Sequence, residues 1–395
     1  MPAAADARAQ PAQSTVRPER FPDTHMHIVH TEASRGWGGQ EIRILGEAAG
    51  MIKRGHRVSL LCPRDSCIYA EAAGRGVAAT ALPIGRKNLQ GLLALREWLK
   101  SNPADVINTH SSTDAWLSAL ACASLPVPPP MVRTRHLSTA VSNNFATRWL
   151  YGTATSHIVT TGEKLREQLM RDNGIAGSAL TSVPTGIDPG VFGPGDRVAA
   201  RLALDLPLNA MIIGIVATLR DWKGHTYLIE AFARMRRRQA APGLLLAIVG
   251  DGPERERLES SVAANGVQES VRMAGNQSQV APWLHAMDVF CLPSYGHEGV
   301  PQALMQAMSC ALPVVSTPVG SIAEIIEPEI TGLMVAPKNI DALCSALERL
   351  TGDAGLRKRL GSAARGVAVM RFGENIMLDR MEEIFRSAVA GRKRV

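Results

Sequence analysis

Short apolar runs alternate with longer segments of mixed polarity along most of this chain. Runs rich in Val, Ile and Leu predict buried strands, and the segments between them are long enough for helices. This alternation is typical of βαβ units with parallel sheets. The first half has predicted strands at residues 26–31, 58–62, 77–82, 105–109, 131–134 and 157–160, and the second half at 211–217, 244–249, 270–273, 288–292, 313–316 and 332–335.

The first predicted helix lies between the first two strands. Ile42, Leu45, Ala49 and Ile52 recur at helical spacing, which predicts one apolar face directed at the sheet. A basic pair followed by Gly55 marks the expected end of this helix, because glycine is the preferred residue just beyond a helix C-terminus.

The length and one break in the pattern divide the chain in two. A chain of 395 residues is too long for one ordinary domain and suffices for two of roughly 150–200 residues. Residues 184–195 concentrate Gly and Pro, so we expect an interdomain connection there, with Phe192 as an anchor. The predicted organisation is α/β: a disordered leader at 1–24, then doubly wound domains at 25–190 and 191–371. Such sheets bind ligands at the carboxyl ends of their strands, so two facing domains predict a cleft for two substrates.

Composition narrows the function classes. Aromatic residues make up only 4% of the chain, which argues against stacking platforms for single-stranded nucleic acid. The six cysteines form no C-x-x-C pair and the ten histidines no H-E-x-x-H, so we expect a reduced, cytoplasmic protein without a metal site. No run approaches the ~20 apolar residues of a membrane span. The net charge of +7 suits an anionic acceptor, peripheral contact with an anionic inner leaflet, or an ordinary solvated surface.

The most informative segment reads Glu298-Gly299-Val300-Pro301, between an apolar strand and a predicted helix. The free amides of a first helical turn attract negative charge, so this turn suits a charged ligand. A phosphate would repel Glu298, and its carboxylate is better suited to accept hydrogen bonds from sugar hydroxyls. The segment therefore predicts a site for a charged sugar donor.

A cationic turn closes the first strand of the second half. Arg220 and Lys223 lie three residues apart, ahead of Gly224 and a helix. They fit a clamp on a departing diphosphate, whose developing charge must be neutralised; a solvated basic loop is the alternative. No D-x-D sequence occurs in the chain, so we expect no metal ion and no other cofactor.

Polar residues also follow strands of the first half. Gly38 and Gly39 follow the first strand, where glycine allows backbone amides to approach an anion closely, or simply allows a tight turn. His110 ends the fourth predicted strand and faces the expected cleft. It would hydrogen-bond a donor sugar, assist proton movement, or serve only as a polar loop residue.

The fifth strand ends in a second cationic group. Arg133, Arg135 and His136 occupy this end, where they either bind an anionic acceptor or pair with acidic neighbours.

Together these motifs resemble the retaining glycosyltransferases with the GT-B fold, the large family 4 or "group 1". The resemblance covers about residues 26–385. Within the family, the chain most resembles bacterial transferases of lipopolysaccharide and other cell-envelope glycans. It implies a metal-independent enzyme that moves a sugar from a nucleotide-sugar donor to a glycan or lipid-linked acceptor with retention of configuration. It also implies that residues 372–395 form a helix that crosses back to the first domain, followed by a basic tail.

The resemblance implies roles for individual residues. Glu298 corresponds to a glutamate that touches the donor sugar, and Gln306 stands where the family has a second glutamate on the nucleotide ribose. An amide carbonyl can accept from a ribose hydroxyl but brings no charge. The implied donor-side and catalytic residues are Gly38, Gly39, His110, Arg220, Lys223, Arg272, Met273, Glu298, Gly299, Val300, Pro301 and Gln306.

Other function classes remain open at this point. A sugar-nucleotide epimerase or hydrolase on the same fold would need acids placed for water or proton abstraction, which no motif singles out. A non-catalytic nucleotide-binding protein gains weight from Gln306. An NAD-dependent oxidoreductase would need the glycine fingerprint followed by an acidic residue, which the sequence lacks.

Overall fold

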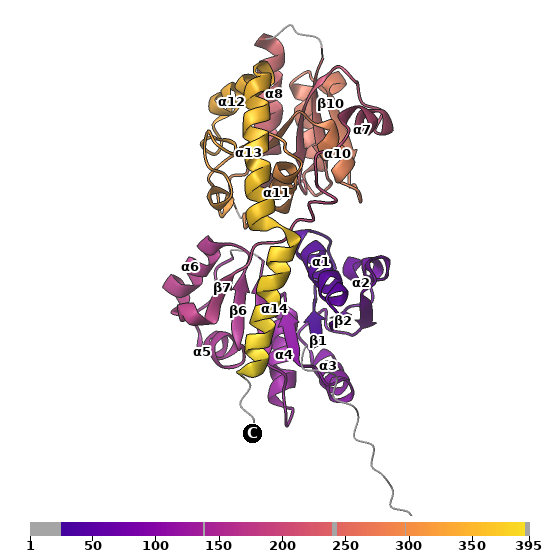
Figure 1. Cartoon of the computed structure of the whole chain (residues 1–395), viewed down its shortest axis with the longest axis vertical. Helices are drawn as coiled ribbons and strands as arrows, with labels where there is room; N and C mark the ends of the chain where they lie inside the picture. Colours follow the sequence, from indigo (N-terminus) through magenta and orange to yellow (C-terminus); the bar gives the residue numbers. More distant parts are fainter. Residues whose placement is uncertain (1–24, 137–138, 239–242, 297, 392–395) are drawn as a thin grey trace, which may run out of the picture.

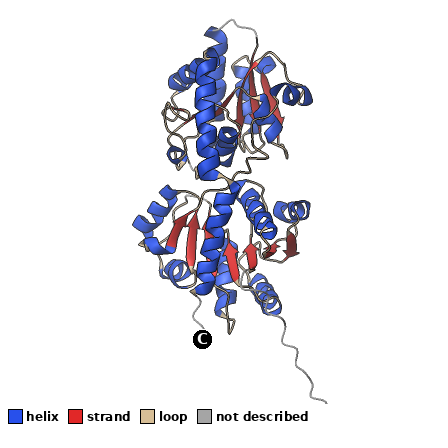
Figure 2. Cartoon of the chain, in the orientation of Figure 1, coloured by secondary structure: helices blue, strands red, loops and turns tan. Residues whose placement is uncertain are grey.

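The computed structural model describes residues 25–136, 139–238, 243–296 and 298–391. It contains two parallel sheets, each with helices on both faces, stacked along the long axis of the molecule (Figures 1 and 2). This confirms the predicted fold class, two doubly wound α/β domains. The leader and the basic tail of the prediction lie outside the described residues.

The first sheet has seven strands in the order β3-β2-β1-β4-β5-β6-β7, all paired in parallel. Its strands are β1 (His27–Thr31), β2 (Arg57–Cys62), β3 (Ala78–Ala81), β4 (Val106–Thr109), β5 (Met131–Arg135), β6 (His157–Thr160) and β7 (Leu180–Ser182). The accompanying helices are α1 (Gly39–Lys53), α2 (Cys67–Ala72), α3 (Leu89–Ser101), α4 (Ser112–Ala123), α5 (Phe145–Arg148), α6 (Glu163–Asn173) and, from the far end of the chain, α14 (Glu374–Ala390).

The second sheet has six parallel strands in the order β10-β9-β8-β11-β12-β13. Its strands are β8 (Met211–Val216), β9 (Leu244–Val249), β10 (Val271–Gly275), β11 (Val289–Leu292), β12 (Val314–Ser316) and β13 (Leu333–Met334). Its helices are α7 (Arg197–Ala203), α8 (His225–Arg238), α9 (Arg255–Ala264), α10 (Ala281–Ala286), α11 (Gln302–Ser309), α12 (Ile340–Gly352) and α13 (Ala354–Phe372).

Alternating burial explains the three-layer domains. Along β1, Ile28 belongs to the apolar cluster under α1, α2 and α14, and Val29 to the cluster under α3, α4 and α6. Both residues are fully buried, because a parallel sheet covered on both faces exposes neither side. The second sheet has a single large core of its own. Each sheet therefore leaves its strand ends as the place where polar side chains can gather.

All twelve predicted strands are present, with ends shifted by at most two residues. The prediction missed β7, whose three residues include a polar Thr and Ser and carry little apolar signal. The predicted apolar face of α1 is displaced round the helix from the observed one. Of the four predicted residues Leu45 is fully buried, whereas Ile42, Ala49 and Ile52 are only partly buried. Ile44, Ala48 and Met51 complete the fully buried stripe.

The buried face of α1 also carries Arg43 and Glu47, which are 1% and 0% exposed. Charged residues are almost never buried in this way unless they are paired, so the apolar pattern left out the part of the buried face that carries this pair. A counting of apolar spacing alone cannot recover a helix face that contains an ion pair.

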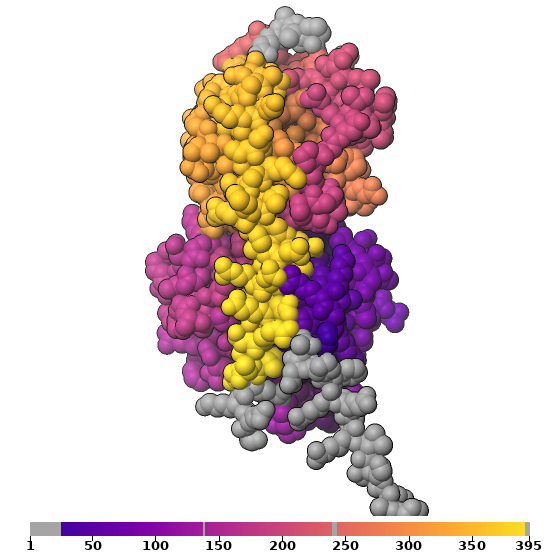
Figure 3. Space-filling view, viewed as in Figure 1, coloured from indigo at the N-terminus to yellow at the C-terminus, as the bar shows by residue number. Residues whose placement is uncertain are grey.

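The chain crosses between the domains at two adjacent points. Ile187, in the predicted connection, donates its amide to Phe372 at 2.8 Å and accepts from the amide of Glu374 at 3.0 Å. Phe192 packs on the core of the second domain. Helix α13 packs on α11 and α12 of the second domain, and α14 packs on the first sheet. In Figure 3 this C-terminal segment runs over one face of both domains. Among the described residues, no helix is both long and apolar enough to span a membrane.

Candidate functional site

Both sheets reverse their strand order in the middle, between β1 and β4 and between β8 and β11. Ligands of doubly wound domains bind beyond the carboxyl ends of the strands at such switch points. The Gly38-Gly39 turn follows β1 and His110 follows β4, whereas the Arg220–Lys223 turn follows β8 and the Glu298 turn follows β11. The topology thus brings separate sequence motifs to two switch points.

At the second switch point, Lys223 and Glu298 form an ion pair. The Lys223 Nζ donates to both carboxylate oxygens of Glu298, at 2.8 and 2.9 Å. Ser294, just beyond β11, donates its hydroxyl to Glu298 Oε1 at 2.6 Å. Glu298 is 5% exposed and the Lys223 side chain 20%, so the carboxylate is oriented from two sides. Two residues expected to hold sugar and diphosphate are therefore in direct contact.

Two glycines allow these turns to pack closely. At Gly320, where φ is +59°, an added Cβ would lie 1.9 Å from the Glu298 carbonyl oxygen. At Gly224, where φ is +78°, it would lie 2.1 Å from the carbonyl oxygen of Pro293. A side chain at either position would meet backbone and require a strained conformation. The position of Glu298 beside Lys223 thus depends on glycine at both neighbouring turns.

The Glu298 turn also touches the first domain. Gln302, the first residue of α11, donates its side-chain amide to the carbonyl of Gly39. A Cβ at Gly299 would lie 3.4 Å from the carbonyl oxygen of His136 and from Oγ1 of Thr161. Gly39, His136 and the Glu298 turn, though distant in the sequence, line one interdomain contact.

A second contact holds the domains beside this turn. Glu324 accepts from the backbone amides of Glu163 and Lys164 at 2.8 and 2.9 Å, at the N-terminus of α6. A carboxylate at a helix N-terminus is favoured by the free amides and by the helix dipole. Val300 of the Glu298 turn lies close to this contact: a Cβ added at Gly162 would be 3.3 Å from its side chain.

Arg220 is exposed at the mouth of the same turn. Its guanidinium lies 5.7 Å from the centre of the Trp222 ring. Asp221, next to it, pairs with Arg257 at 3.1 Å and accepts from the Tyr295 hydroxyl, which lowers the pKa of Asp221. The Asp221 carboxylate is therefore bound to Arg257 and to Tyr295.

The remaining expected donor residues lie further along the second domain. Pro301 is the N-cap residue of α11, and Gln306 is half-buried on the second turn of that helix. Arg272 and Met273 lie on β10, an edge strand separated from β11 by β9 and β8. Sequence reasoning missed Ser294 and Gln302. Each directly flanks a predicted element of the Glu298 segment, so position beside the motif was the available signal.

The polar residues of the first sheet are arranged differently from the expectation. His110 is 5% exposed and lies between His30 and His136 rather than at an open surface. Arg133 is 3% exposed and its guanidinium lies 4.5 Å from the centre of the Tyr151 ring. Arg135 donates to the Tyr151 hydroxyl at 3.1 Å. Both arginines thus contact Tyr151, and the buried Asp114 carboxyl also acts electrostatically on Arg133.

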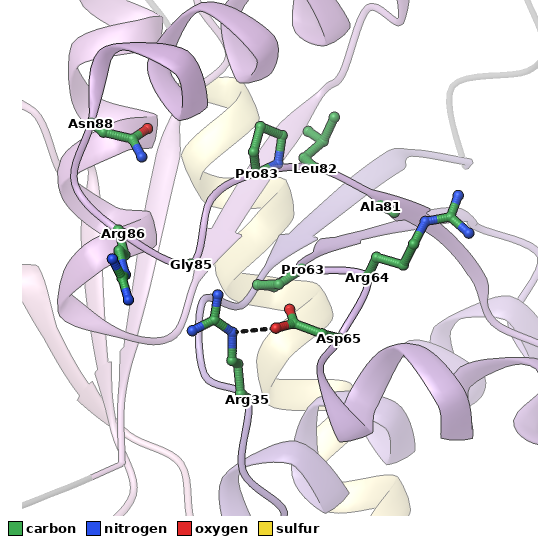
Figure 4. Close-up of a pocket in the computed structure, with 10 residues that line it drawn as sticks. All are labelled: Arg35, Pro63, Arg64, Asp65, Ala81, Leu82, Pro83, Gly85, Arg86 and Asn88. Carbon is green, nitrogen blue, oxygen red and sulfur yellow. Dashed lines mark ion pairs between the residues drawn. The ribbon is translucent and has the colours of Figure 1, made fainter.

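A cationic hollow of about 470 Å³ lies beyond β2 and β3, beside the loop that follows β1. Figure 4 shows Arg35 and Arg86 on either side of Gly85, whereas Arg64 extends past Ala81 away from them. Arg35 is paired with Asp65 at 2.8 Å. These residues could not be recognised as a group from the sequence, because nothing in the chain order brings them together.

Glu32, at the end of β1, is a further buried acid that sequence reasoning missed. Burial, reinforced by the nearby Asp114 carboxyl, raises the pKa of Glu32 to about 8. Its carboxyl accepts from the Ser34 amide at 2.7 Å and from the Gln40 side chain. A protonated carboxyl can donate as well as accept hydrogen bonds, so Glu32 can do both in the segment between β1 and α1.

Comparison with known families accounts for both halves of this site. Residues 37–191 match the model described as Glycosyltransferase Family 4, and residues 198–367 match Glycosyl transferases group 1. The chain is a group 1 glycosyltransferase. This confirms the resemblance inferred from the Glu298 and Arg220–Lys223 motifs. Members of this family are enzymes that take a sugar from a nucleotide-sugar donor and transfer it with retention of anomeric configuration.

Individual relatives of this group 1 glycosyltransferase vary in what they act on. It is 28% identical over 283 residues to a D-inositol 3-phosphate glycosyltransferase of Kribbella flavida, covering 66% of each chain, just under two thirds. It is 32% identical over 196 residues to the lipopolysaccharide core biosynthesis glycosyltransferase LpsE of Rhizobium meliloti, covering 49% of this chain and 56% of LpsE. The structure of Anabaena HepE in complex with UDP-glucose superposes with a TM-score of 0.79 at 19% identity, covering 92% of this chain and all of HepE.

Gln306 tests how this glycosyltransferase departs from the family pattern. For Gln306→Glu we expect kcat/KM to stay within about tenfold, or roughly 1.4 kcal/mol, because a carboxylate also accepts from a ribose hydroxyl. Gln306→Leu removes the acceptor at similar size and should mainly raise the donor KM. Steady-state kinetics of the two variants check this. A leucine variant with the wild-type donor KM would make Gln306 a packing residue.

Proposed function

We propose that this protein moves a sugar from a nucleotide-sugar donor to a glycan or lipid-linked acceptor in the synthesis of lipopolysaccharide or a related cell-envelope glycan, with retention of configuration. One observation carries the assignment: the Lys223–Glu298 pair, oriented by Ser294, lies where the second sheet reverses and where the first domain touches it. The likeness to LpsE supports the glycan class.

The chemistry follows from charge. Departure of a nucleoside diphosphate leaves negative charge, which Lys223 and the exposed Arg220 would stabilise without a metal ion. Glu298 would accept from hydroxyls of the donor sugar and thereby fix the reacting carbon. The acceptor hydroxyl would attack on the face that the diphosphate leaves, and the leaving phosphate oxygen would take its proton.

The acceptor would lie against the first domain. The arginines of the hollow beyond β2 and β3 suit phosphate or carboxylate groups of a cell-envelope acceptor. Arg133, Arg135 and His136 stay candidates for the same acceptor.

The net charge of +7 also favours peripheral contact with an anionic inner membrane from the cytoplasm. Sedimentation with phosphatidylglycerol vesicles tests this contact. A protein that does not bind the vesicles at low salt would refute it.

Nucleoside diphosphate release from a panel of nucleotide sugars, with an envelope glycolipid extract as acceptor, tests the function. With one of the donors we expect nucleoside diphosphate release that requires the glycolipid extract. This release should fall when the glycolipid is dephosphorylated, and it should persist in EDTA. Release without any acceptor would indicate a hydrolase, and no release from any donor would indicate a binding protein. EDTA inhibition reversed by Mg²⁺ or Mn²⁺ would show that an ion carries the leaving-group charge.

A further inference from the structure

Three histidines form a hydrogen-bonded chain across the middle of the first sheet. His30 Nδ1 lies 2.9 Å from His110 Nε2, and His110 Nδ1 lies 3.0 Å from His136 Nε2. They lie on or just beyond β1, β4 and β5, which are neighbours in the sheet. His30 is fully buried, whereas the carbonyl of His136 adjoins Gly299. This histidine chain (His30, His110 and His136) therefore links the interior of the domain to the Glu298 turn.

A buried ion pair closes the inner end of the histidine chain. Glu47 Oε1 lies 3.9 Å from His30 Nε2, and Glu47 Oε2 lies 3.7 Å from Arg43 Nε. Asn108 donates to Glu47 Oε1 at 3.2 Å. From α14, Phe385 covers the His30 ring edge-on, with 6.4 Å between ring centres. These side chains are out of contact with water. Burial raises the pKa of Glu47 to about 7, whereas Arg43 and the hydrogen bond from Asn108 favour its charged form. Above that pH the charge of the Glu47 carboxylate acts on His30 with little screening.

Each imidazole of this chain holds a single proton. Burial and then Arg43 lower the pKa of His30 to about 3, and burial holds the pKa values of His110 and His136 well below their usual range. A neutral imidazole has one N–H and one lone pair, so each hydrogen bond in the chain fixes the direction of the next. The proton arrangement of all three rings is therefore decided at one end.

The carboxylate of Glu47 decides that direction. It favours a proton on His30 Nε2, which leaves the lone pair of His30 Nδ1 to accept from His110 Nε2. His110 Nδ1 then accepts from His136 Nε2. The lone pair of the last ring is consequently on His136 Nδ1, where it can accept from a hydroxyl of a sugar.

We propose that Glu47 and His30 are positioning residues for sugar transfer, which act through His110 to keep the proton of His136 on Nε2 and an acceptor on Nδ1. The inference rests on the proposed glycosyl transfer. It assigns a role to an ion pair that is buried inside the first domain, on the part of the α1 face that the apolar pattern left out.

Nitrogen-15 NMR of histidine side chains tests the proton arrangement without any substrate. In the wild-type protein we expect all three rings to be neutral with the proton on Nε2, each assigned by single His→Gln variants. In Glu47→Gln the charge is lost, and we expect the signals of His136 to shift toward the form protonated on Nδ1. We also expect kcat to fall about tenfold with the donor KM within about twofold, the scale of one lost hydrogen bond in the transition state.

His30→Phe is the second variant, because it keeps a ring between Phe385 and His110 but breaks the chain. Glu382→Gln is the matched control: Glu382 lies 3.3 Å from His56 in the same domain, and we expect only the His56 signals to change. A proton on Nδ1 of His136 in the wild type, or an unchanged His136 with full kcat in either folded variant, would overturn the proposal. Loss of nucleoside diphosphate release in the wild type would instead refute the proposed function and leave the NMR result intact.

Discussion

The Glu298→Gln variant is expected to lose about 100-fold or more in turnover while its fold stays intact. The carboxylate receives Lys223 on both oxygens and Ser294 on one, so it is oriented before the donor arrives. An amide offers only one acceptor oxygen, and its NH₂ group would face the Lys223 ammonium. Losing one preorganised polar contact in an active site costs about 10²–10³ in rate.

Glu329→Gln serves as the matched control for this substitution. Glu329 also receives two hydrogen bonds from one cation, because Arg349 donates to both of its oxygens at 2.9 Å, but the pair is exposed. We expect this variant to keep wild-type turnover. Circular dichroism and thermal unfolding establish that both variants are folded. A Glu298→Gln enzyme with near-normal turnover would remove Glu298 from the site.

The Lys223→Met variant is expected to bind nucleoside diphosphate about tenfold or more weakly and to transfer the sugar about 100-fold more slowly. Methionine keeps much of the aliphatic stem, so the change removes chiefly the charge. Both the expected contact with the diphosphate and the observed contact with Glu298 are lost, and the second leaves a buried carboxylate without its cation. Calorimetry with the nucleoside diphosphate and turnover assays measure the two effects.

A double variant separates the two roles of Lys223. If Lys223 only orients Glu298, Lys223→Met combined with Glu298→Gln should be no slower than Glu298→Gln alone. If it also stabilises the leaving group, as we expect, the double variant should be slower and should bind the diphosphate more weakly. Lys100→Met controls for loss of an exposed lysine, since Lys100 pairs with Glu97 on α3 far along the chain from the site.

The fold could be predicted from the sequence because the strands are local signals. Runs such as Leu244–Val249 are apolar throughout, as parallel strands buried on both faces must be. Strand β7 could not be predicted in this way, because its burial comes from its neighbours rather than from its own composition. The buried face of α1 was displaced for a related reason. Arg43 is polar in the sequence, and although Glu47 follows it four residues later on the same helix, only the tertiary structure supplies the Val183 carbonyl as a further partner.

The candidate site could be predicted only in part. Motifs at the strand ends gave the residues of the two switch points, because a turn after a strand is recognisable in one dimension. The histidine chain could not be predicted, since His30 and His110 are 80 positions apart and nothing in this spacing indicates a hydrogen bond between them. The contact of Gln302 with Gly39 spans both domains and is equally invisible in the sequence.

The paired crossings at Ile187 and Glu374 have a consequence for substrate exchange. Because both chain segments pass through one place and are bonded to each other, a relative rotation of the domains would pivot there. Such a rotation separates Gln302 from Gly39, which belong to different domains. It does not separate Lys223 from Glu298, which belong to the same one. In such a rotation the half of the site proposed to receive the donor would keep its alignment while the gap to the proposed acceptor half widened. Products could then leave while the Lys223–Glu298 pair stayed intact.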